Sequence, residues 1–394
     1  MSYDYVKIAD FCHLVSRGKT PKYDDNGSGK VVKSAHVQIE NIRWENCPNV
    51  SDEFVLKYKD KFRLRKRDVL LNGTGTGTLG RPGCVNEEPD GIFILDSHVN
   101  LFRVKESKLF YRFLFYWLLA PQCQREIERS HTGSTNQIEL SAIRAGNLSI
   151  PLPPLEEQKR IAAILDKADR IRRKRQEAIR LTEELGRSIF LDMFGDPVSN
   201  PKGWEVASLS EFGEVLTGNT PPRADLENYG DCIEWIKSDN ITTPYHFLTE
   251  ASEKLSSIGK KKGRVVPPGS ILVCCIAGSK SSIGRAAIAD REVAFNQQIN
   301  AIVPNKSVET YFLYSQFLVA QSLVQSESTD SMKGLVNKSK FSGIQFLKPP
   351  LSKQVEFRDK FLKFIDINKK LAVSLCESEN LFNSLLQKAF RGEL

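Results

Sequence analysis

The chain contains one internal repeat, and this repeat limits its possible folds more than any other feature. Four short landmarks recur in the same order in the two halves of the 394 residues. The first landmark is Gly18-Lys19-Thr20-Pro21, which matches Gly218-Asn219-Thr220-Pro221, and the second is Glu40-Asn41-Ile42, which matches Asp239-Asn240-Ile241. The third is Asp68-Val69-Leu70-Leu71 followed by Gly80-Arg81, and it matches Ser270-Ile271-Leu272-Val273 followed by Gly284-Arg285. The fourth is Pro153-Pro154-Leu155-Glu156-Glu157-Gln158, which matches Pro349-Pro350-Leu351-Ser352-Lys353-Gln354. A period of about 200 residues indicates duplication of a whole domain, because solenoid repeats are much shorter.

Each copy begins with a segment that combines strand and helix patterns. Short apolar runs at residues 68–71 and 270–273 predict strands,. Residues 111–119 and 311–323 predict helices in matching places, and glycine- and serine-rich stretches predict the loops between the elements,. The fold class is therefore an α/β or α+β two-repeat architecture.

After each Pro-Pro-Leu the pattern changes to that of a long helix, at residues 155–194 and 353–391. Apolar residues recur at steps of three and four, the spacing of a coiled coil. We expect the two helices to pair antiparallel, with Asn368 as a polar position that fixes the register. The alternative is two unrelated core helices, one in each domain. The residues expected to pair are Ile161, Ile164, Ala168, Ile171 and Leu185 with Phe361, Phe364, Asn368, Leu371 and Leu375.

These patterns predict four segments. Residues 1–152 and 196–348 form two globular domains, and residues 153–195 and 349–394 form the long helices that separate them.

Composition restricts the function only weakly. The formal net charge of +8 is compatible with a polyanionic partner but common in other proteins,. The eight cysteines lack the spacing of a zinc or redox motif, and the first residues do not resemble a signal peptide, so we expect reduced thiols in the cytoplasm,. The apolar stretch at residues 110–121 is too short to cross a bilayer and predicts a core helix, not a membrane segment,.

Patterns typical of catalysis are incomplete. Gly75-Thr76-Gly77-Thr78-Leu79-Gly80 fits a dinucleotide fingerprint, but Pro82 and Gly83 disfavour the helix that the fingerprint requires,. Asn219-Thr220-Pro221-Pro222-Arg223 lacks the aromatic residue of adenine methyltransferases, and the histidines have no ligand spacing,. We therefore predict no catalytic residue, no metal site and no bound cofactor.

Binding remains the best-supported activity. Polar, basic and glycine-bearing loops are the candidates for contacts with DNA, although solvated surface explains any single loop equally well. The candidate residues are Arg17, Lys19, Thr20, Lys22, Asn72, Thr74, Thr76, Arg81, His131, Ser134 and Asn136 in the first domain, and Asn219, Thr220, Arg223, Lys260, Lys261, Lys262, Arg264, Ser279, Lys280, Arg285, Lys333, Asn337 and Lys338 in the second.

The ordered motifs resemble a known family. Residues 151–162, Pro-Leu-Pro-Pro-Leu-Glu-Glu-Gln-Lys-Arg-Ile-Ala, precede a long helix that ends in Met-Phe-Gly-Asp-Pro at residues 193–197. Together with Leu-Leu-Gln-Lys-Ala-Phe-Arg-Gly-Glu-Leu at residues 385–394, they resemble the specificity subunits of type I restriction–modification systems over the whole chain. The distal copy departs from the pattern, because Ser-Lys-Gln-Val at residues 352–355 replaces Glu-Glu-Gln-Lys.

The resemblance implies a non-enzymatic DNA-binding subunit in the cytoplasm of a prokaryote. Each globular domain would be a target-recognition domain that reads one half of a split, asymmetric site in double-stranded DNA, and the paired helices would set the spacer. Two methyltransferase subunits would dock on this scaffold, and motor–nuclease subunits would join through them. S-adenosylmethionine, ATP and Mg would bind to those partner subunits. The alternatives are a coiled-coil scaffold without DNA readout and a nucleotide-dependent enzyme that uses residues 75–80.

Overall fold

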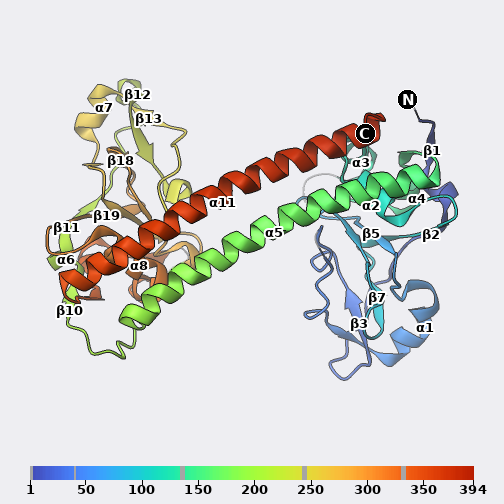
Figure 1. Cartoon of the computed structure of the whole chain (residues 1–394), viewed down its shortest axis with the longest axis horizontal. Coiled ribbons are helices and arrows are strands. Elements are labelled where there is room, and N and C mark those ends of the chain that lie inside the picture. The colour runs from blue at the N-terminus through green and yellow to red at the C-terminus, as the bar shows by residue number, and fades with distance from the viewer. Residues whose placement is uncertain (1–2, 40, 134–137, 242–245, 330–333) are drawn as a thin grey trace. The chain divides into compact units, whose positions relative to one another are not determined.

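The computed structural model describes the chain except for residues 1–2, 40, 134–137, 242–245 and 330–333 (Figure 1). It divides into two compact units, with Met1–Lys174 and Cys376–Leu394 in unit 1 and Arg175–Leu375 in unit 2. The two long helices are α5 (Leu155–Phe194), green in Figure 1, and α11 (Leu351–Arg391), red. Each of them therefore contributes one part to each unit.

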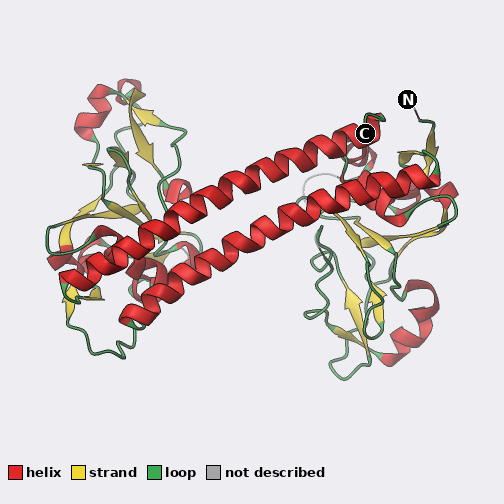
Figure 2. Ribbon diagram, in the orientation of Figure 1, coloured by secondary structure: helices red, strands yellow, loops and turns green. Residues whose placement is uncertain are grey.

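Unit 1 combines three small sheets with short helices (Figure 2). The strand orders are β2-β8-β5-β6, β4-β3-β7 and β1-β9; β3 and β7 are parallel, and the other neighbours are antiparallel. The strands are β1 (Tyr5–Lys7), β2 (Cys12–Arg17), β3 (Gly29–Val32), β4 (Asn49–Val50), β5 (Val69–Asn72), β6 (Pro82–Cys84), β7 (Phe93–Leu95), β8 (Val99–Val104) and β9 (Ser149–Pro151). The helices are η1 (Ile8–Phe11), α1 (Asp52–Phe62), α2 (Tyr111–Leu119), α3 (Pro121–Ser130) and α4 (Ala142–Gly146).

Unit 2 repeats this plan in the sheets β11-β19-β15-β17, β13-β12-β18-β14 and β10-β21. It adds β14 as a fourth strand of the second sheet, and it also adds the pair β16-β20. Its strands are β10 (Val206–Ser208), β11 (Gly213–Thr217), β12 (Tyr229–Ile236), β13 (Lys254–Leu255), β14 (Val265–Val266), β15 (Ile271–Cys274), β16 (Ile276–Ala277), β17 (Ala286–Ile288), β18 (Val293–Phe295), β19 (Ile299–Pro304), β20 (Gly334–Leu335) and β21 (Gln345–Leu347). Its helices are α6 (Leu209–Phe212), η2 (Leu226–Asn228), η3 (Ser238–Ile241), α7 (Ser257–Lys262), η4 (Lys280–Ser282), α8 (Thr310–Val319), α9 (Gln321–Ser326) and α10 (Lys338–Gly343). The predicted two-repeat architecture is confirmed.

The glycines of the landmarks are needed where backbone segments meet closely. A Cβ atom added to Gly18 would lie 1.9 Å from the carbonyl oxygen of Leu95, and one added to Gly218 would lie 2.1 Å from that of Asn296. Gly80 and Gly284 adopt φ of +77° and +80°, in the left-handed region that favours glycine,. These landmarks therefore record the backbone geometry that both copies share.

One predicted landmark pairing is wrong. In unit 2 the side chain of Asn240 accepts a hydrogen bond from the backbone N–H of Lys237, the first residue after β12. In unit 1 the equivalent bond runs from the backbone N–H of Lys33, the first residue after β3, to Nδ1 of His36. The counterpart of Asn240 is therefore His36, whereas the predicted counterpart, Asn41, is exposed. The three-letter match ignored the register that β3 and β12 impose on the loops after them.

A further repeated pair escaped the sequence analysis. Asn100 in β8 donates a side-chain hydrogen bond of 3.1 Å to Leu140 O, and Asn300 in β19 donates one of 3.3 Å to Val336 O. Both asparagines are almost fully buried. The shared spacing was visible, since Val-Asn at residues 99–100 matches Ile-Asn at residues 299–300.

The motif glutamine explains how each long helix is attached to its unit. In unit 1, Gln158 Oε1 accepts from the N–H of Phe110, the residue that precedes α2, and Nε2 donates to the carbonyls of Lys108 and Pro153. In unit 2, Gln354 accepts from Glu309 N–H, just before α8, and donates to Pro349 O. One buried amide thus satisfies backbone groups from two elements, which fixes α5 on α2 and α11 on α8.

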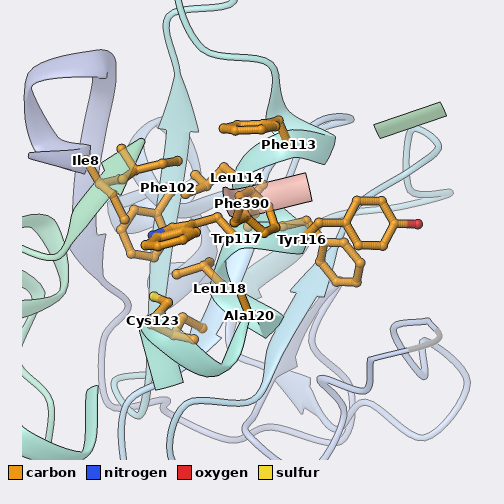
Figure 3. Packing of buried hydrophobic residues seen from close by; sticks show 14 of the residues in the cluster. Ile8, Phe102, Phe113, Leu114, Tyr116, Trp117, Leu118, Ala120, Cys123 and Phe390 are labelled. Carbon is orange, nitrogen blue, oxygen red and sulfur yellow. The ribbon is translucent and has the colours of Figure 1, made fainter. Parts of the chain in front are cut away.

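Each unit has a main core in which parts of both long helices pack on one shorter helix, α2 in unit 1 and α8 in unit 2. In unit 1 the rings of Phe113 and Trp117 on α2 lie 5.2 and 5.0 Å from that of Phe390 (Figure 3). In unit 2 the rings of Phe312 on α8 and Phe194 lie 4.8 Å apart. The early part of α5 shares the unit 1 core with the late part of α11, and the reverse holds in unit 2, so the helices pair antiparallel within each unit, as predicted.

The buried stripe of α5 differs from the predicted seam. Ile161, Ala168, Phe361, Phe364 and Asn368 are buried, whereas Ile171 and Leu185 are 41% and 54% exposed. The buried positions are instead Leu165 and Gly186, each one residue after a predicted position. A straight helix has 3.6 residues per turn, so its buried face drifts away from a strict seven-residue repeat. Ile164, Leu371 and Leu375 are partly buried.

Two helix boundaries also differ from the prediction. The helix expected at residues 311–323 is broken at Ala320, where φ is −119° and ψ is 44°, so that α8 and α9 are separate. The second long helix begins two residues before its predicted start at Lys353. Its first turn follows Pro349 and Pro350, and proline is well tolerated at a helix start.

Candidate nucleic-acid interface

The structure brings the candidate segments of unit 1 together around Glu139. Arg17, at the end of β2, forms an ion pair with Glu139 and donates a 2.6 Å hydrogen bond to Ser97 O. Thr74 and Thr132 each form a β-bridge to Glu139. Three loops that are distant in sequence therefore share one polar region.

The candidate segments of unit 2 meet in two pairs. Asn219 donates a 2.8 Å hydrogen bond to Lys262 O and accepts a 2.6 Å one from Arg264 N–H. This amide joins the loop after β11 to the loop after α7. Separately, β16 and β20 pair through Ala277 and Gly334, which joins the segment that follows β15 to the one that precedes α10.

Several candidates have structural roles that the sequence did not reveal. Asn72 is fully buried and its amide donates to Ser34 O, so the prediction that it contacts DNA is wrong in this structure. It was predicted as a loop residue but ends strand β5, where its side chain supports the neighbouring loop. The amide oxygen and the amide nitrogen of Asn219 both form hydrogen bonds within the protein. Asn337 caps α10, because its side chain accepts a hydrogen bond from the N–H of Lys340.

Some of the basic candidates already have carboxylate partners. Arg223 makes two hydrogen bonds, of 2.8 and 3.1 Å, to Glu253 and lies over the rings of Tyr229 and Trp235. The hydrogen bonds from Arg223 and Lys237 lower the pKa of Glu253 to about 2. Other ion pairs join Lys22 to Glu53, Lys260 to Glu292, and Lys262 to Asp225 and Glu227. These cations must share or exchange their partners before they can neutralise phosphate.

The remaining candidates are mostly at the surface. Lys19, Thr20, Thr76, Lys261, Arg264, Ser279, Lys280, Arg285, Asn337 and Lys338 are exposed, and Thr74, Arg81, His131 and Thr220 are partly buried. Thr220 donates a hydrogen bond to Gln297. Ser134, Asn136 and Lys333 lie outside the described residues.

A basic cluster in unit 1 was only partly predicted. Arg81 donates a 2.9 Å hydrogen bond to Ser34 O, and its pKa is lowered by burial and by the nearby positive charge of Arg43. Lys33 and Arg43 both lower the pKa of His36, after the larger effect of burial. Positive groups held this close together favour an anionic ligand, because they repel one another without one. Arg43 directly follows the landmark at residues 40–42, and this position in the sequence could have indicated it as a candidate.

The residues that the structure describes give no support for the other chemistries considered. No group of three or more His, Cys, Asp and Glu side chains among them could hold a metal ion. The glycine-rich residues 75–80 form a turn that leads into β6, not into the helix of a dinucleotide site,. No described helix is long and apolar enough to span a bilayer.

Comparison with known proteins identifies the family. The family model described as "Type I restriction modification DNA specificity domain" matches residues 2–181 and 201–375, most of both repeats. The chain belongs to this family. The resemblance inferred from the Pro-Pro-Leu motifs and the two chain segments at residues 193–197 and 385–394 is therefore confirmed.

Individual specificity subunits are similar over different shares of their length. The HindI specificity subunit of Haemophilus influenzae is 32% identical over 48% of this chain, an alignment that spans only 38% of that protein. A putative MjaX specificity subunit of Methanocaldococcus jannaschii is 21% identical over 92% of this chain and 87% of that protein. The crystal structure of the S subunit from M. genitalium has the same fold, with a TM-score of 0.59 and 14% identity over 99% of this chain and 96% of that one.

Proposed function

We propose that this chain is the DNA-reading, non-catalytic specificity subunit of a type I restriction–modification complex. Unit 1 and unit 2 each read one half of a bipartite, asymmetric target in double-stranded DNA. The observation that carries the proposal is a shared backbone on which the two units place different side chains. The loops after β2 and β11 both need a glycine at their first residue, Gly18 and Gly218. The next residue differs, because it is Lys19 in unit 1 and Asn219 in unit 2.

Two domains that share a backbone but recognise different DNA sequences must carry different side chains at their DNA contacts. Lysine and arginine bind phosphates or guanine, whereas asparagine and glutamine suit adenine. Unit 1 has the basic cluster of Lys33, Arg43 and Arg81, whereas Lys237, the counterpart of Lys33 in unit 2, is paired with Glu253. We therefore assign unlike half-sites to the two units.

The long helices supply the scaffold role. Leu351, Leu362 and Val373 on α11 are 46%, 39% and 56% exposed. Their spacing of eleven residues is close to three full turns, so they lie on one face of the helix, about 16 Å apart along its axis. We assign this face of α11, together with the exposed Ile171 and Leu185 of α5, to the docking of two methyltransferase subunits, through which motor–nuclease subunits join. S-adenosylmethionine, ATP and Mg then belong to those partners, and the complex works in the cytoplasm of a prokaryotic cell.

The test is to purify this chain with its methyltransferase partner and map adenine methylation on genomic DNA. The complex should methylate one bipartite sequence, and each component alone should methylate none. The paired variant Arg43→Ala with Arg81→Ala should relax or abolish recognition of one half-site only, whereas Lys108→Ala, an exposed charge change in the same unit, should leave the site unchanged. Turnover of S-adenosylmethionine by this chain alone would contradict the proposal.

A complex that assembles but shows no DNA sequence preference would favour the coiled-coil scaffold instead. Binding should also weaken with salt, because contacts to phosphates release counterions. The Arg43→Ala variant should make that salt dependence shallower by about one phosphate contact.

A further inference from the structure

Unit 2 contains a cavity of about 300 Å³ that is lined by α8 and by the parts of α5 and α11 that belong to this unit. The rings of Phe190, Phe317, Phe361 and Phe364 form much of its wall, and each of these residues is less than 5% exposed. An engineered apolar cavity of about 150 Å³ holds benzene, so this one has room for one or two fused rings.

The internal repeat locates the same place in unit 1. Tyr116 lies six residues after Phe110, and Ser315 lies six residues after Glu309, the two residues whose N–H groups bind the motif glutamines. On the long helices, Phe382 and Gly186 each lie 28 residues after the motif glutamine. Tyr116 and Phe382 of unit 1 therefore correspond to Ser315 and Gly186 of unit 2.

Ring contacts support this correspondence independently. Phe113 and Phe312 each lie three residues after the same N-cap position, and Phe390 and Phe194 each lie 36 residues after the motif glutamine. The rings of Phe113 and Phe390 are 5.2 Å apart, and those of Phe312 and Phe194 are 4.8 Å apart. The two units thus superimpose in register at this point.

Unit 1 fills this place with its own aromatic side chains. The rings of Tyr116 and Phe382 lie 6.2 Å apart, and Tyr116 packs in the cluster of Trp117 and Phe390 (Figure 3). The Tyr116 hydroxyl donates to Asp166 at 2.7 Å and accepts from Arg112 at 2.8 Å. An aromatic ring with a hydrogen-bonding group is therefore the native occupant in this copy.

Unit 2 has two small residues there instead, Ser315 and Gly186, and both line the cavity. Phe364, whose counterpart is Ala168, takes part of the space: a Cβ atom added to Gly186 would lie 2.8 Å from its Cζ atom. The cavity is the part that Phe364 does not fill.

Two buried polar atoms of residues that line the cavity have no hydrogen-bond partner among the described residues. One is Oγ of Ser315, a residue only 2% exposed, and the other is Nε2 of His246. Nδ1 of His246 is already occupied, 3.0 Å from the Tyr314 hydroxyl. A buried polar atom without a partner costs free energy. A hydroxyl or N–H group of a ligand could recover it once the side chain turns toward the cavity.

We propose that this cavity is a binding site for a small neutral aromatic molecule that carries one hydroxyl or N–H group, of the phenol or indole class. The ring packs among the phenylalanines, and the polar group bonds to Ser315 and His246. The molecule is neutral because most of the wall is aromatic, and the three charged residues that also line the cavity, Glu183, Arg187 and Arg285, carry both signs of charge,. The site goes beyond the function proposed above, although Arg285, one of the candidates for a DNA contact, also lies in its wall.

The experiment titrates phenol and indole into the full chain and follows binding by calorimetry and by the melting temperature of unit 2. Both probes should bind once per chain and raise the melting temperature. Ser315→Tyr, which restores the residue of unit 1, should abolish binding, while Ser322→Tyr on the exposed face of α9 should not. Ser315→Ala should weaken phenol binding about five-fold, as expected for one lost hydrogen bond, and leave toluene binding unchanged.

A second readout does not depend on whether Ser315→Tyr folds. In protein with ¹³C-labelled histidine, saturating phenol should shift the ring signal of His246, assigned with His246→Gln, more than those of the other four histidines. Absence of binding, equal binding by folded Ser315→Tyr, or an unmoved His246 signal would overturn the proposal. A His246 signal that moves only when the methyltransferase is added would replace the small molecule with a side chain of that partner.

Discussion

Unit 1 and unit 2 fill the seam between their long helices with opposite arrangements of large and small side chains. The helix that begins at the Pro-Pro-Leu motif contributes Ala168 in unit 1 and Phe364 in unit 2, each ten residues after the motif glutamine. The partner helix contributes Phe382 in unit 1 and Gly186 in unit 2. Each unit therefore keeps one large and one small residue, although the two have changed sides. Complementary shape was retained while the residues themselves diverged.

The polar content of the two seams differs as well. Unit 1 places an ion pair at the edge of its core, where Arg112 binds Asp166 on α5 and Tyr116 shares the same carboxylate. In unit 2 the counterparts of these three residues are Tyr311, Leu362 and Ser315, and the ring of Tyr311 packs on that of Phe361. Phe361 belongs to an aromatic cluster that also contains Phe190, Phe194, Phe312 and Phe357. The shared backbone is thus compatible with either solution, which explains how the repeat survives with few identical residues.

The largest expected effect follows from truncating the rings at the centre of each seam. Phe194→Ala should lower the free energy of unfolding of unit 2 by about 3–5 kcal/mol, because the ring is fully buried against Phe190, Phe312 and Phe357,. Phe390→Ala should have a similar effect on unit 1. Hydrogen–deuterium exchange measures each unit separately, since one global value would mix the two.

The matched control for both substitutions is Leu181→Ala, at a position that is 51% exposed. It should change the stability of either unit by less than about 0.5 kcal/mol. If Phe194→Ala and Phe390→Ala each destabilised both units equally, the division of the seam into two separate cores would be wrong.

The next effect compares the two motif glutamines. Gln158→Leu should destabilise unit 1 by about 3 kcal/mol, because the substitution leaves one backbone N–H and two carbonyls without their partner in a buried site,. Gln354→Leu should cost less in unit 2, where the side chain makes one accepted and one donated hydrogen bond. The order of the two effects, measured by exchange at α2 and α8, is the test; equal losses would mean that the bond to Lys108 contributes nothing.

The sequence predicted the long helices because they contain no proline and, apart from Gly186, no glycine, and because each carries one apolar stripe. It did not predict which residues of the stripe are buried, since Ile171 and Leu185 fit the seven-residue spacing as well as Leu165 and Gly186 do. That choice depends on the drift of a straight helix and on the ring of Phe364, which needs a glycine opposite it,. Neither follows from periodicity alone.

The candidate interface was predictable as a set of loops but not residue by residue. Loop composition selected Arg17, Thr74 and Arg81, which the structure places in two neighbouring polar regions of unit 1. It also selected Asn72, which is buried, and missed Arg43. The polarity of a residue does not tell whether it faces solvent or supports a neighbouring loop, because that depends on where the strand ends.

A pH-dependent difference between the units should follow from His246. Burial lowers the pKa of His246 to about 4, so the folded state holds the neutral ring while the unfolded chain takes up a proton below about pH 6.5,. Between these values the unfolded state binds more protons, so the stability of unit 2 is complete above pH 6.5 and falls as the pH is lowered toward 4. At pH 5 the loss should be on the order of 2 kcal/mol.

His246→Gln is the control for this pH dependence, because it cannot take up a proton. Unit 2 of this variant should lose less stability between pH 6.5 and 5 than the unchanged protein. Unit 1 contains His36, whose pKa is also lowered by burial, so exchange has to be followed in each unit separately. The same pH slope in unit 2 with and without His246 would assign the loss to other groups.

The smallest expected effect concerns the seam position occupied by Arg172 in unit 1 and Asn368 in unit 2, each 14 residues after the motif glutamine. Arg172 bonds to Asp169 at 2.7 Å and lies over the ring of Phe382, so Arg172→Leu should destabilise unit 1 slightly. Asn368 is 4% exposed, and neither atom of its amide has a hydrogen-bond partner among the described residues. Asn368→Leu should therefore stabilise unit 2 by about 1 kcal/mol, since it replaces an unsatisfied polar group with an apolar one of similar size. A loss of stability in Asn368→Leu, measured by exchange in α11, would mean that the amide has a partner in solution and that the two units treat this position alike.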